Sequence, residues 1–181
     1  MNLKEKPIKR NQIFDGKVFK VYCEKVVLPD GNKADREIVA HNGGVCVIPV
    51  EGKYVYLVKQ YRRGVDSICL EFPAGKLESG EKHYDAGLRE LKEEIGACAS
   101  IYEYIGEIYP TPAYCSEIIH MYIADGLTLG EQNTDADEFL NVERVEIDTL
   151  FQMVQAGEIS DAKTLIGAYK LKDYINKKNN N

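Results

Sequence analysis

The chain has 181 residues, the size of one ordinary domain or of a domain with a short added arm. Hydrophobic residues make up 44% and charged residues 29%, a balance typical of a globular protein with a filled core. The net charge is -6 and the sequence contains no basic stripe, so we expect no nucleic acid partner. An acidic protein that acts on phosphates needs cations to do so.

The chain contains five widely spaced cysteines without a CxxC pair: Cys23, Cys46, Cys69, Cys98 and Cys115. We interpret them as small buried hydrophobes in a reducing compartment, not as a disulfide framework or a zinc site. The N-terminal stretch lacks the apolar run of a signal peptide, and no segment reaches the about 18 apolar residues of a membrane span. We therefore expect a cytoplasmic protein without a membrane contact.

Strands dominate the first half of the predicted structure. The β-branched and aromatic segments are 18–28, 36–40, 44–50, 54–61 and 69–72. A strong turn, Pro29–Asn32, joins the first two strands, and Glu51–Lys53 joins the next two. We assign residues 1–42 to an N-terminal antiparallel β arm and residues 43–181 to the main domain.

The second half alternates helices with strands. Helical periodicity covers 82–95 and 161–175, and a shorter helix is expected at 148–155. Asp148 and Ser160 are the expected N-caps of the last two helices. Further strands are predicted at 101–109, 117–124 and 139–147. Together these elements predict an α/β fold with a mixed sheet.

The helix predicted at 82–95 carries clustered acids. At about 100° per residue, its apolar stripe, which we expect to be buried, is Tyr84, Leu88, Leu91 and Ile95. The opposite side holds Glu90, Glu93 and Glu94. A solvated acidic face is the simpler interpretation. However, the small Ala86 and Gly87 beside the acids indicate a close approach, and clustered carboxylates repel one another unless they bind a cation such as Mg²⁺ or Mn²⁺.

The spacing around this helix carries a family pattern. Gly75, Glu81 and the run Arg89–Gly96 match G-x5-E-x7-R-E-U-x-E-E-x-G-U, where U is a bulky aliphatic residue. The chain thereby resembles the Nudix superfamily, and Ala97, in the last U position, is the single departure. The resemblance implies an α/β/α sandwich with a mixed sheet, here preceded by the arm. It also implies Mg²⁺-dependent hydrolysis of a nucleoside diphosphate linked to another group, with Mn²⁺ as the other candidate ion.

The same resemblance implies roles for individual residues. The implied metal ligands are Glu90, Glu94 and the backbone carbonyl of Ala74. Glu93 would contribute to catalysis and Arg89 would orient the glutamates. Glu81 would hold the helix start to the preceding loop or reach the metal through water.

Four further segments, 36–41, 58–62, 70–75 and 157–164, resemble the ADP-ribose pyrophosphatase branch of this superfamily. So does Pro112, sixteen residues beyond Gly96. This resemblance implies hydrolysis of ADP-ribose to AMP and ribose 5-phosphate by a homodimer whose arms help to build each site. Two alternatives stay open: another nucleoside diphosphate sugar, such as GDP-mannose, and a sensor that binds ADP-ribose without cutting it.

The branch also implies a general base in a late acidic loop, here 130–139. We favour Glu138, with Asp137 and Asp135 behind it, against the alternative of a solvated acidic loop. Arg62 and Arg63 are candidate phosphate ligands because guanidinium groups suit phosphate oxygens. Arg36 is a weaker candidate, and Pro112 is a further substrate-binding candidate.

Adenine needs a flat apolar partner, and the chain has no tryptophan. The candidates in the arm are Phe14, Phe19 and Tyr22. The three histidines, His41, His83 and His120, have no metal-ligand spacing, so we interpret them as structural or exposed.

Overall fold

The computed structural model describes residues 2–134 and 138–180, which form two compact units. The first unit consists of Met1–Gly43 and Tyr109–Ile118, and the second of Gly44–Ile108 and Ile119–Asn181. The second unit holds the predicted acidic helix and most candidate site residues. None of the described helices is long and apolar enough to span a membrane.

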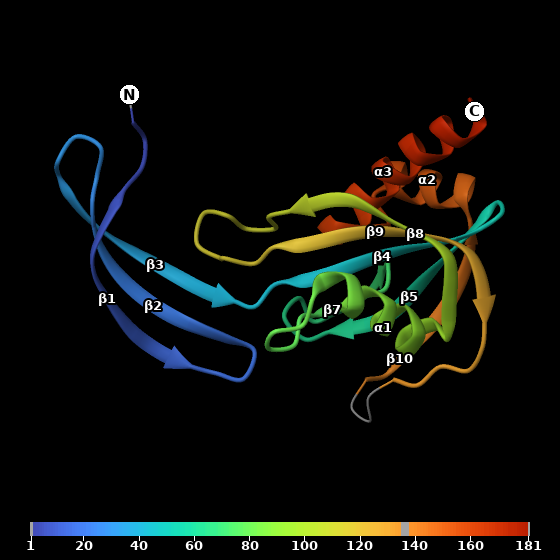
Figure 1. Cartoon of the computed structure of the whole chain (residues 1–181), viewed down its shortest axis with the longest axis horizontal. Helices are drawn as coiled ribbons and strands as arrows, with labels where there is room; N and C mark the ends of the chain where they lie inside the picture. The colour runs from blue at the N-terminus through green and yellow to red at the C-terminus, as the bar shows by residue number, and fades with distance from the viewer. Residues whose placement is uncertain (1, 135–137, 181) are drawn as a thin grey trace. The chain divides into compact units, whose positions relative to one another are not determined.

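The first unit is a three-stranded antiparallel sheet of β1 (Lys6–Asp15), β2 (Phe19–Val27) and β3 (Lys33–His41), drawn in blue in Figure 1. Sequence reasoning missed β1, because every residue of this strand is exposed and its side chains show no apolar alternation. Among the described residues of this unit, Val26 is the one fully buried hydrophobic side chain. The predicted turn before β3 is present, where the Asn32 N–H donates to Asp30 Oδ1 at 2.9 Å.

The segment Tyr109–Ile118 pairs with the end of β3. The Val39 N–H donates to the Tyr114 carbonyl at 2.7 Å, and the Ser116 N–H donates to the Val39 carbonyl at 2.9 Å. Pro112 lies in the exposed turn of this segment. The strand predicted from residue 117 therefore begins at Ile119, because the preceding residues already bond to β3.

The sheet of the second unit has seven strands, with β10, β5, β4, β9 and β8 in spatial order, β6 beside β5 and β7 beside β4. Their bounds are β4 (Gly44–Glu51), β5 (Tyr54–Arg62), β6 (Ser67–Glu71), β7 (Ala74–Lys76), β8 (Ala97–Ile108), β9 (Ile119–Leu129) and β10 (Leu140–Glu146). Strands β4 and β9 are parallel and the other pairs are antiparallel. The prediction of a mixed sheet is therefore confirmed.

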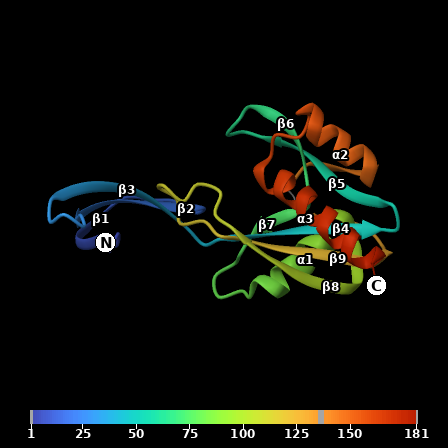
Figure 2. The same ribbon diagram turned by 90° about the horizontal axis from the view of Figure 1, so that it is seen from above.

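Helices cover both faces of this sheet. Helix α1 (His83–Ile95) lies on one side, and α2 (Ile147–Ala156) and α3 (Ala162–Asn179) lie on the other (Figure 1). Figure 2 shows α2 and α3 next to each other. Alternate residues of β4 point to opposite faces of the sheet. Val45 and Val47 pack with α1, whereas Cys46 and Ile48 pack with α2 and α3. This arrangement is the predicted α/β/α sandwich.

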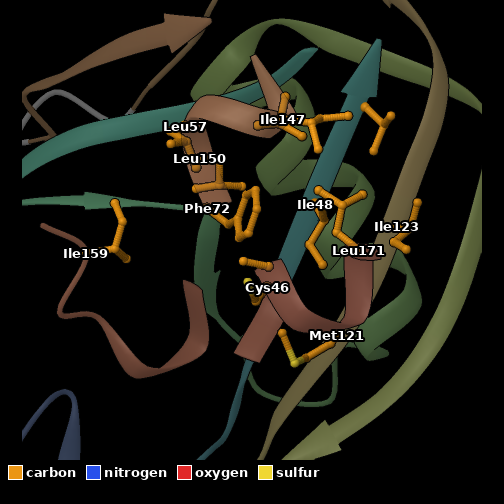
Figure 3. Close-up of a cluster of buried hydrophobic side chains, with 13 residues drawn as sticks. Cys46, Ile48, Leu57, Phe72, Met121, Ile123, Ile147, Leu150, Ile159 and Leu171 are labelled. Carbon is orange, nitrogen blue, oxygen red and sulfur yellow. The ribbon is translucent and has the colours of Figure 1, made fainter. Parts of the chain in front are cut away.

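The larger core cluster lies between the sheet and the helices α2 and α3. Figure 3 shows the Phe72 ring between Leu150 of α2 and Ile48 and Cys46 of β4. Gly167 of α3 faces this ring, and a Cβ added at this glycine would lie 2.9 Å from Phe72 Cδ2. A residue without a side chain therefore lets α3 pack closely against Phe72.

The helix ends differ in part from the prediction. Gly96 and Gly157 end α1 and α2 in the left-handed conformation, as a glycine C-cap does. At the other ends, α2 begins after Glu146 and α3 begins after Asp161, so the predicted N-caps Asp148 and Ser160 are wrong. For α3 the reason is direct: the Asp161 carboxylate accepts the Thr164 N–H at 2.9 Å.

The cysteines agree with the prediction only in part. Cys46 is buried, Cys98 is exposed, and the other three are half-buried; all five are free thiols. Cys98 follows Ala97 on β8, and because side chains alternate along a strand, Ala97 packs in the core cluster beside α1 while Cys98 points to the other face.

Candidate active site

The acids of α1 do not all point to solvent. Glu90 and Glu94 are only 6% and 1% exposed, and they share the buried side of the helix with Ala86. Tyr84, predicted to be buried, is 48% exposed. The predicted orientation is therefore wrong for these residues. The physical reason is that β7 lies against the acid-bearing side and the N–H of its first residue, Ala74, donates to Glu94.

The backbone at Ala74 and Gly75 forms the wall opposite these two carboxylates. The Ala74 N–H donates to Glu94 Oε2 at 3.0 Å. A Cβ added at Gly75 would lie 1.8 Å from Glu90 Oε1, so this carboxylate packs directly on the glycine backbone. The glycine of the sequence pattern is therefore required by contact with the first glutamate of the helix.

Gly87 has a different reason to be small. A Cβ added there would lie 1.8 Å from the Tyr102 hydroxyl oxygen and 3.0 Å from Val45 Cγ2. Both atoms belong to the sheet beneath α1. Gly87 is therefore small because core side chains fill the space beside it, and its size gives no support to a ligand there.

Arg89 joins three carboxylates. Its Nε and Nη2 donate to the two oxygens of Glu81 at 3.0 and 3.1 Å, and its Nη1 donates to Glu90 Oε1 at 2.7 Å and Glu93 Oε2 at 2.9 Å. Arg89 lowers the pKa of the Glu81 carboxyl. The Glu81 carboxylate also accepts the Glu78 N–H at 2.9 Å, so the pair fixes the turn before the helix to the helix itself.

The buried pair lacks enough positive charge around it. Burial, followed by the neighbouring Glu90 and then Glu138, raises the pKa of Glu94 to about 8 despite the Ala74 N–H and the more distant Arg62. Burial also raises the pKa of Glu90 against the attraction of Arg89. A hard divalent cation bound between these two buried carboxylates would stabilise their ionised form, and carboxylate oxygens are the ligands that such a cation prefers. The residues present therefore fit such an ion.

The Glu90 and Glu94 side chains alone would provide only part of the coordination shell of a metal ion. Within residues 2–134 and 138–180, no three His, Cys, Asp or Glu side chains converge as a metal-binding group. A pair of carboxylates leaves coordination positions for water or for phosphate oxygens. Such a partial shell of oxygen donors suits a hard divalent cation that keeps several of its waters.

A model of the NUDIX domain matches residues 40–166, more than half of the chain. The chain belongs to the Nudix family. This Nudix protein is 42% identical to an ADP-ribose pyrophosphatase of Bacillus subtilis (strain 168), over 90% of each chain. It is 40% identical to a methanol dehydrogenase activator of Bacillus methanolicus, over 92% of each chain. A crystal structure of an ADP compounds hydrolase covers 98% of each chain with a TM-score of 0.87 at 21% identity, which shows the fold.

Glu138 approaches the buried acids of the Nudix helix. Glu138 lies two residues before β10, which pairs with β5 from Leu140 opposite Gln60. Its charge acts on the pKa of both Glu90 and Glu94. The two other acids considered for this role, Asp135 and Asp137, lie outside the described residues.

The loop before Glu138 is bonded to the end of α1. The Gly130 N–H donates to the Gly96 carbonyl at 2.7 Å, and the Asn133 N–H donates to the Glu93 carbonyl at 3.1 Å. The Gln132 side chain donates to the Glu94 carbonyl. These bonds hold the start of the loop against the helix that carries the acids.

The two candidate arginines of β5 and its turn have different surroundings. Arg62 donates from Nε and Nη2 to the two oxygens of Glu71, both at 2.8 Å. Arg63 is exposed and pairs with Asp66 at 2.9 Å. The structure therefore brings Arg62 to the buried acids and leaves Arg63 in a surface ion pair. Sequence reasoning singled out segment 70–75 but missed the role of its Glu71.

The remaining candidates lie in the first unit. Arg36 donates to both carboxylate oxygens of Glu5, at 3.1 and 2.5 Å. The Phe14 and Phe19 rings are 5.7 Å apart, and the Arg10 guanidinium lies 3.7 Å from the centre of the Tyr22 ring. Their role in substrate binding, like that of Pro112, stays a prediction.

The histidines have structural partners. His83 and His120 stack with ring centres 4.0 Å apart, and His83 Nδ1 lies 2.5 Å from the Tyr122 hydroxyl. His41 Nδ1 accepts the Gly43 N–H at 3.1 Å. Burial and the neighbouring His83 lower the pKa of His120. These contacts agree with the interpretation of the histidines as structural.

Proposed function

We propose that this Nudix protein hydrolyses the pyrophosphate bond of ADP-ribose to AMP and ribose 5-phosphate, with Mg²⁺ or Mn²⁺. The observation that carries the proposal is the buried pair Glu90 and Glu94 packed on the Ala74–Gly75 backbone. The substrate is supported by two relatives that bear the name ADP-ribose pyrophosphatase, from B. subtilis (42% identical) and Mycobacterium tuberculosis (30% identical over 66% of this chain).

The roles follow from the positions. Glu90, Glu94 and the Ala74 carbonyl would hold the ion, which supplies charge neutralisation and activation of water when bound. Arg89 keeps the glutamates in place through its bonds to Glu90 and Glu93. Because a pyrophosphate ester is anionic, these acids can approach it only with cations between them.

Two further residues would complete the reaction. Glu138 accepts the proton of the attacking water, and the water oxygen then bonds to one phosphorus as the bond from that phosphorus to the bridging oxygen breaks. Arg62 donates hydrogen bonds to a phosphate oxygen, since guanidinium groups match phosphate geometry. Glu93, half-buried and bonded to Arg89, supports the arrangement from the rim.

The direct test is release of AMP from ADP-ribose in the presence of Mg²⁺, compared with Glu94→Gln and with a panel of nucleoside diphosphate sugars that includes GDP-mannose. Turnover of another sugar nucleotide in place of ADP-ribose would support the alternative substrate. Binding of ADP-ribose without AMP release would support a sensor.

The B. methanolicus relative supports a second candidate function, the activation of a dehydrogenase. Its identity to this chain, 40%, is close to the 42% of the B. subtilis enzyme, so similarity alone does not separate the two. A methanol dehydrogenase assay with and without the protein, repeated with Glu94→Gln, tests this function. Activation that depends on Glu94 would show that both functions use the same site.

We further propose that the first unit mediates a homodimer. Its sheet exposes Ile8, Ile13, Phe14 and Phe19, and a three-stranded sheet with one fully buried hydrophobic side chain among its described residues needs a partner for stability. Light scattering is expected to give twice the chain mass, and Ile13→Asp is expected to reduce it toward one chain. The free thiols support a reducing compartment, the cytoplasm.

A further inference from the structure

The start of α3 carries a motif that the proposed reaction leaves without a role. Segment 157–164 resembles the ADP-ribose pyrophosphatase branch, yet none of its residues belongs to the Nudix pattern around α1. Within it, Lys163 is 12% exposed in its side chain, which is unusual for a lysine. A buried lysine needs a paired charge, so its partners indicate its role.

Lys163 lies in a group of four charged side chains, the Glu71 cluster, formed by Arg62, Glu71, Asp161 and Lys163. The Lys163 ammonium donates to Glu71 Oε2 and, at 2.9 Å, to Asp161 Oδ1. Glu71 is 2% exposed and also accepts both bonds from Arg62. Lys163 and Glu71 are 92 residues apart in the sequence, so only the fold brings these charges together.

The charges of the Glu71 cluster balance, with two cations against two carboxylates. Without Lys163, Arg62 alone would face the charges of Glu71 and Asp161, and the cluster would be anionic. Arg62 donates to Glu71 from Nε and Nη2, so its Nη1 edge is turned away from that carboxylate. The Arg62 side chain is 40% exposed, and it interacts electrostatically with Glu94. Arg62 thus connects the buried cluster with the acids of α1.

The same helix start also holds the wall of the acid site. The Thr164 hydroxyl donates to Asp161 Oδ2 at 2.6 Å and accepts the Phe72 N–H at 2.9 Å. Two residues later, the Ala74 N–H binds Glu94. Gly167, one turn after Lys163, packs closely against the Phe72 ring, and this contact sets the distance between α3 and the segment that runs from Phe72 to Ala74.

We propose that Lys163 is a positioning residue for substrate binding: by neutralising Glu71 it lets the Nη1 edge of the Arg62 guanidinium, which is turned away from Glu71, attract and orient an anionic phosphate beside Glu94. The inference rests on the proposed function. It gives the α3 motif a role in the affinity for a pyrophosphate substrate, although Lys163 itself is too buried to reach that substrate.

The test is a set of four proteins: wild type, Lys163→Met, the double variant Glu71→Gln with Lys163→Met, and Lys170→Met. Lys170 is the matched control, because it is a half-buried lysine of the same helix whose Nζ donates to the Ile105 carbonyl at 2.7 Å, away from the cluster. Steady-state kinetics with ADP-ribose and Mg²⁺ give kcat and KM separately, and urea unfolding gives the stability of each protein.

Lys163→Met is expected to raise the KM roughly 10- to 100-fold with a smaller change in kcat, as loss of one partner of a buried charge pair does. Lys170→Met is expected to leave the KM within about twofold. In the double variant, at least about half of the rise in log KM should be recovered. Glu71→Gln removes the excess negative charge of the cluster and leaves an amide oxygen that still accepts from Arg62. If Lys163→Met does not fold, Lys163→Gln removes the same charge and keeps a donor for Glu71.

A KM for the double variant as high as that of Lys163→Met, or an equal rise for Lys170→Met, would overturn the inference and leave Lys163 a purely structural residue. Failure of the proposed function has a different signature, since the wild type itself would then release no AMP. In that case calorimetric titration of Mg²⁺-pyrophosphate decides: weaker binding by Lys163→Met than by Lys170→Met supports the inference, and equal binding refutes it.

Discussion

Replacing Glu94 by glutamine should stabilise the metal-free protein. Glu94 is 1% exposed, and its pKa is raised from the usual 4.5 to about 8, mainly by burial and then by Glu90. Between these values the folded chain holds a proton that the unfolded chain has lost, so the free energy of unfolding falls as the pH rises. Glutamine is isosteric, carries no charge, and its amide oxygen still accepts the Ala74 N–H.

The size of the effect follows from the two pKa values. A pKa raised from 4.5 to about 8 corresponds to a penalty of about 5 kcal/mol once the pH exceeds the folded value. The penalty is absent below pH 4.5 and grows through the window between the two values. We therefore expect Glu94→Gln to match the wild type near pH 4.5 and to exceed its stability by several kcal/mol, at most about 5, at pH 8.5.

The assay is urea unfolding followed by circular dichroism at several pH values, with a chelator and again with Mg²⁺. Glu93→Gln is the matched control, since it removes a half-buried carboxylate from the same helix. Excess Mg²⁺ should stabilise the wild type but not Glu94→Gln, because binding to the folded state alone adds to its stability. Equal stability of the two proteins at pH 8.5 in chelator, or equal stabilisation by Mg²⁺, would refute the reasoning.

Four further changes test other parts of the site. Gly75→Ala should push Glu90 aside and weaken Mg²⁺ binding at least about tenfold in calorimetric titration, and unchanged affinity would contradict the contact. Gly87→Ala meets the Tyr102 hydroxyl instead, so it should lower the melting temperature and leave Mg²⁺ affinity within about twofold in the folded protein. Arg89→Met should cost roughly 3 kcal/mol in urea unfolding, since it leaves three carboxylates without their shared partner; a loss below about 1 kcal/mol would argue against this role. Glu138→Gln should lower kcat about 10²- to 10⁴-fold with little change in KM, and a kcat near that of the wild type would exclude Glu138 as the base.

The sequence predicts the local parts of this molecule best. The strands of the mixed sheet and the helix with the acids follow from periodicity and spacing within short segments. Strand β1 escaped prediction because its ten residues are exposed and carry no apolar alternation. Its pairing with β2 comes from backbone hydrogen bonds, which depend little on side-chain type.

The site shows a second limit of sequence reasoning. Periodicity places glutamates on the outside of a helix, yet Glu90 and Glu94 are buried because the Ala74–Gly75 backbone meets them there. The contact between Glu71 and Lys163 joins residues far apart in the chain, which no local pattern encodes. The motif segments pointed to both residues, but only the packing of α3 on Phe72 shows why they meet.

The most direct measurement is an anomalous difference map from a crystal of the protein soaked in Mn²⁺ and AMP. We expect a metal peak within coordination distance of Glu90, Glu94 and the Ala74 carbonyl, with a phosphate oxygen of AMP completing its shell. A map with no peak at these residues, or with the metal and the nucleotide bound elsewhere on the chain, would contradict the proposal that this buried acid pair is where the pyrophosphate is cut.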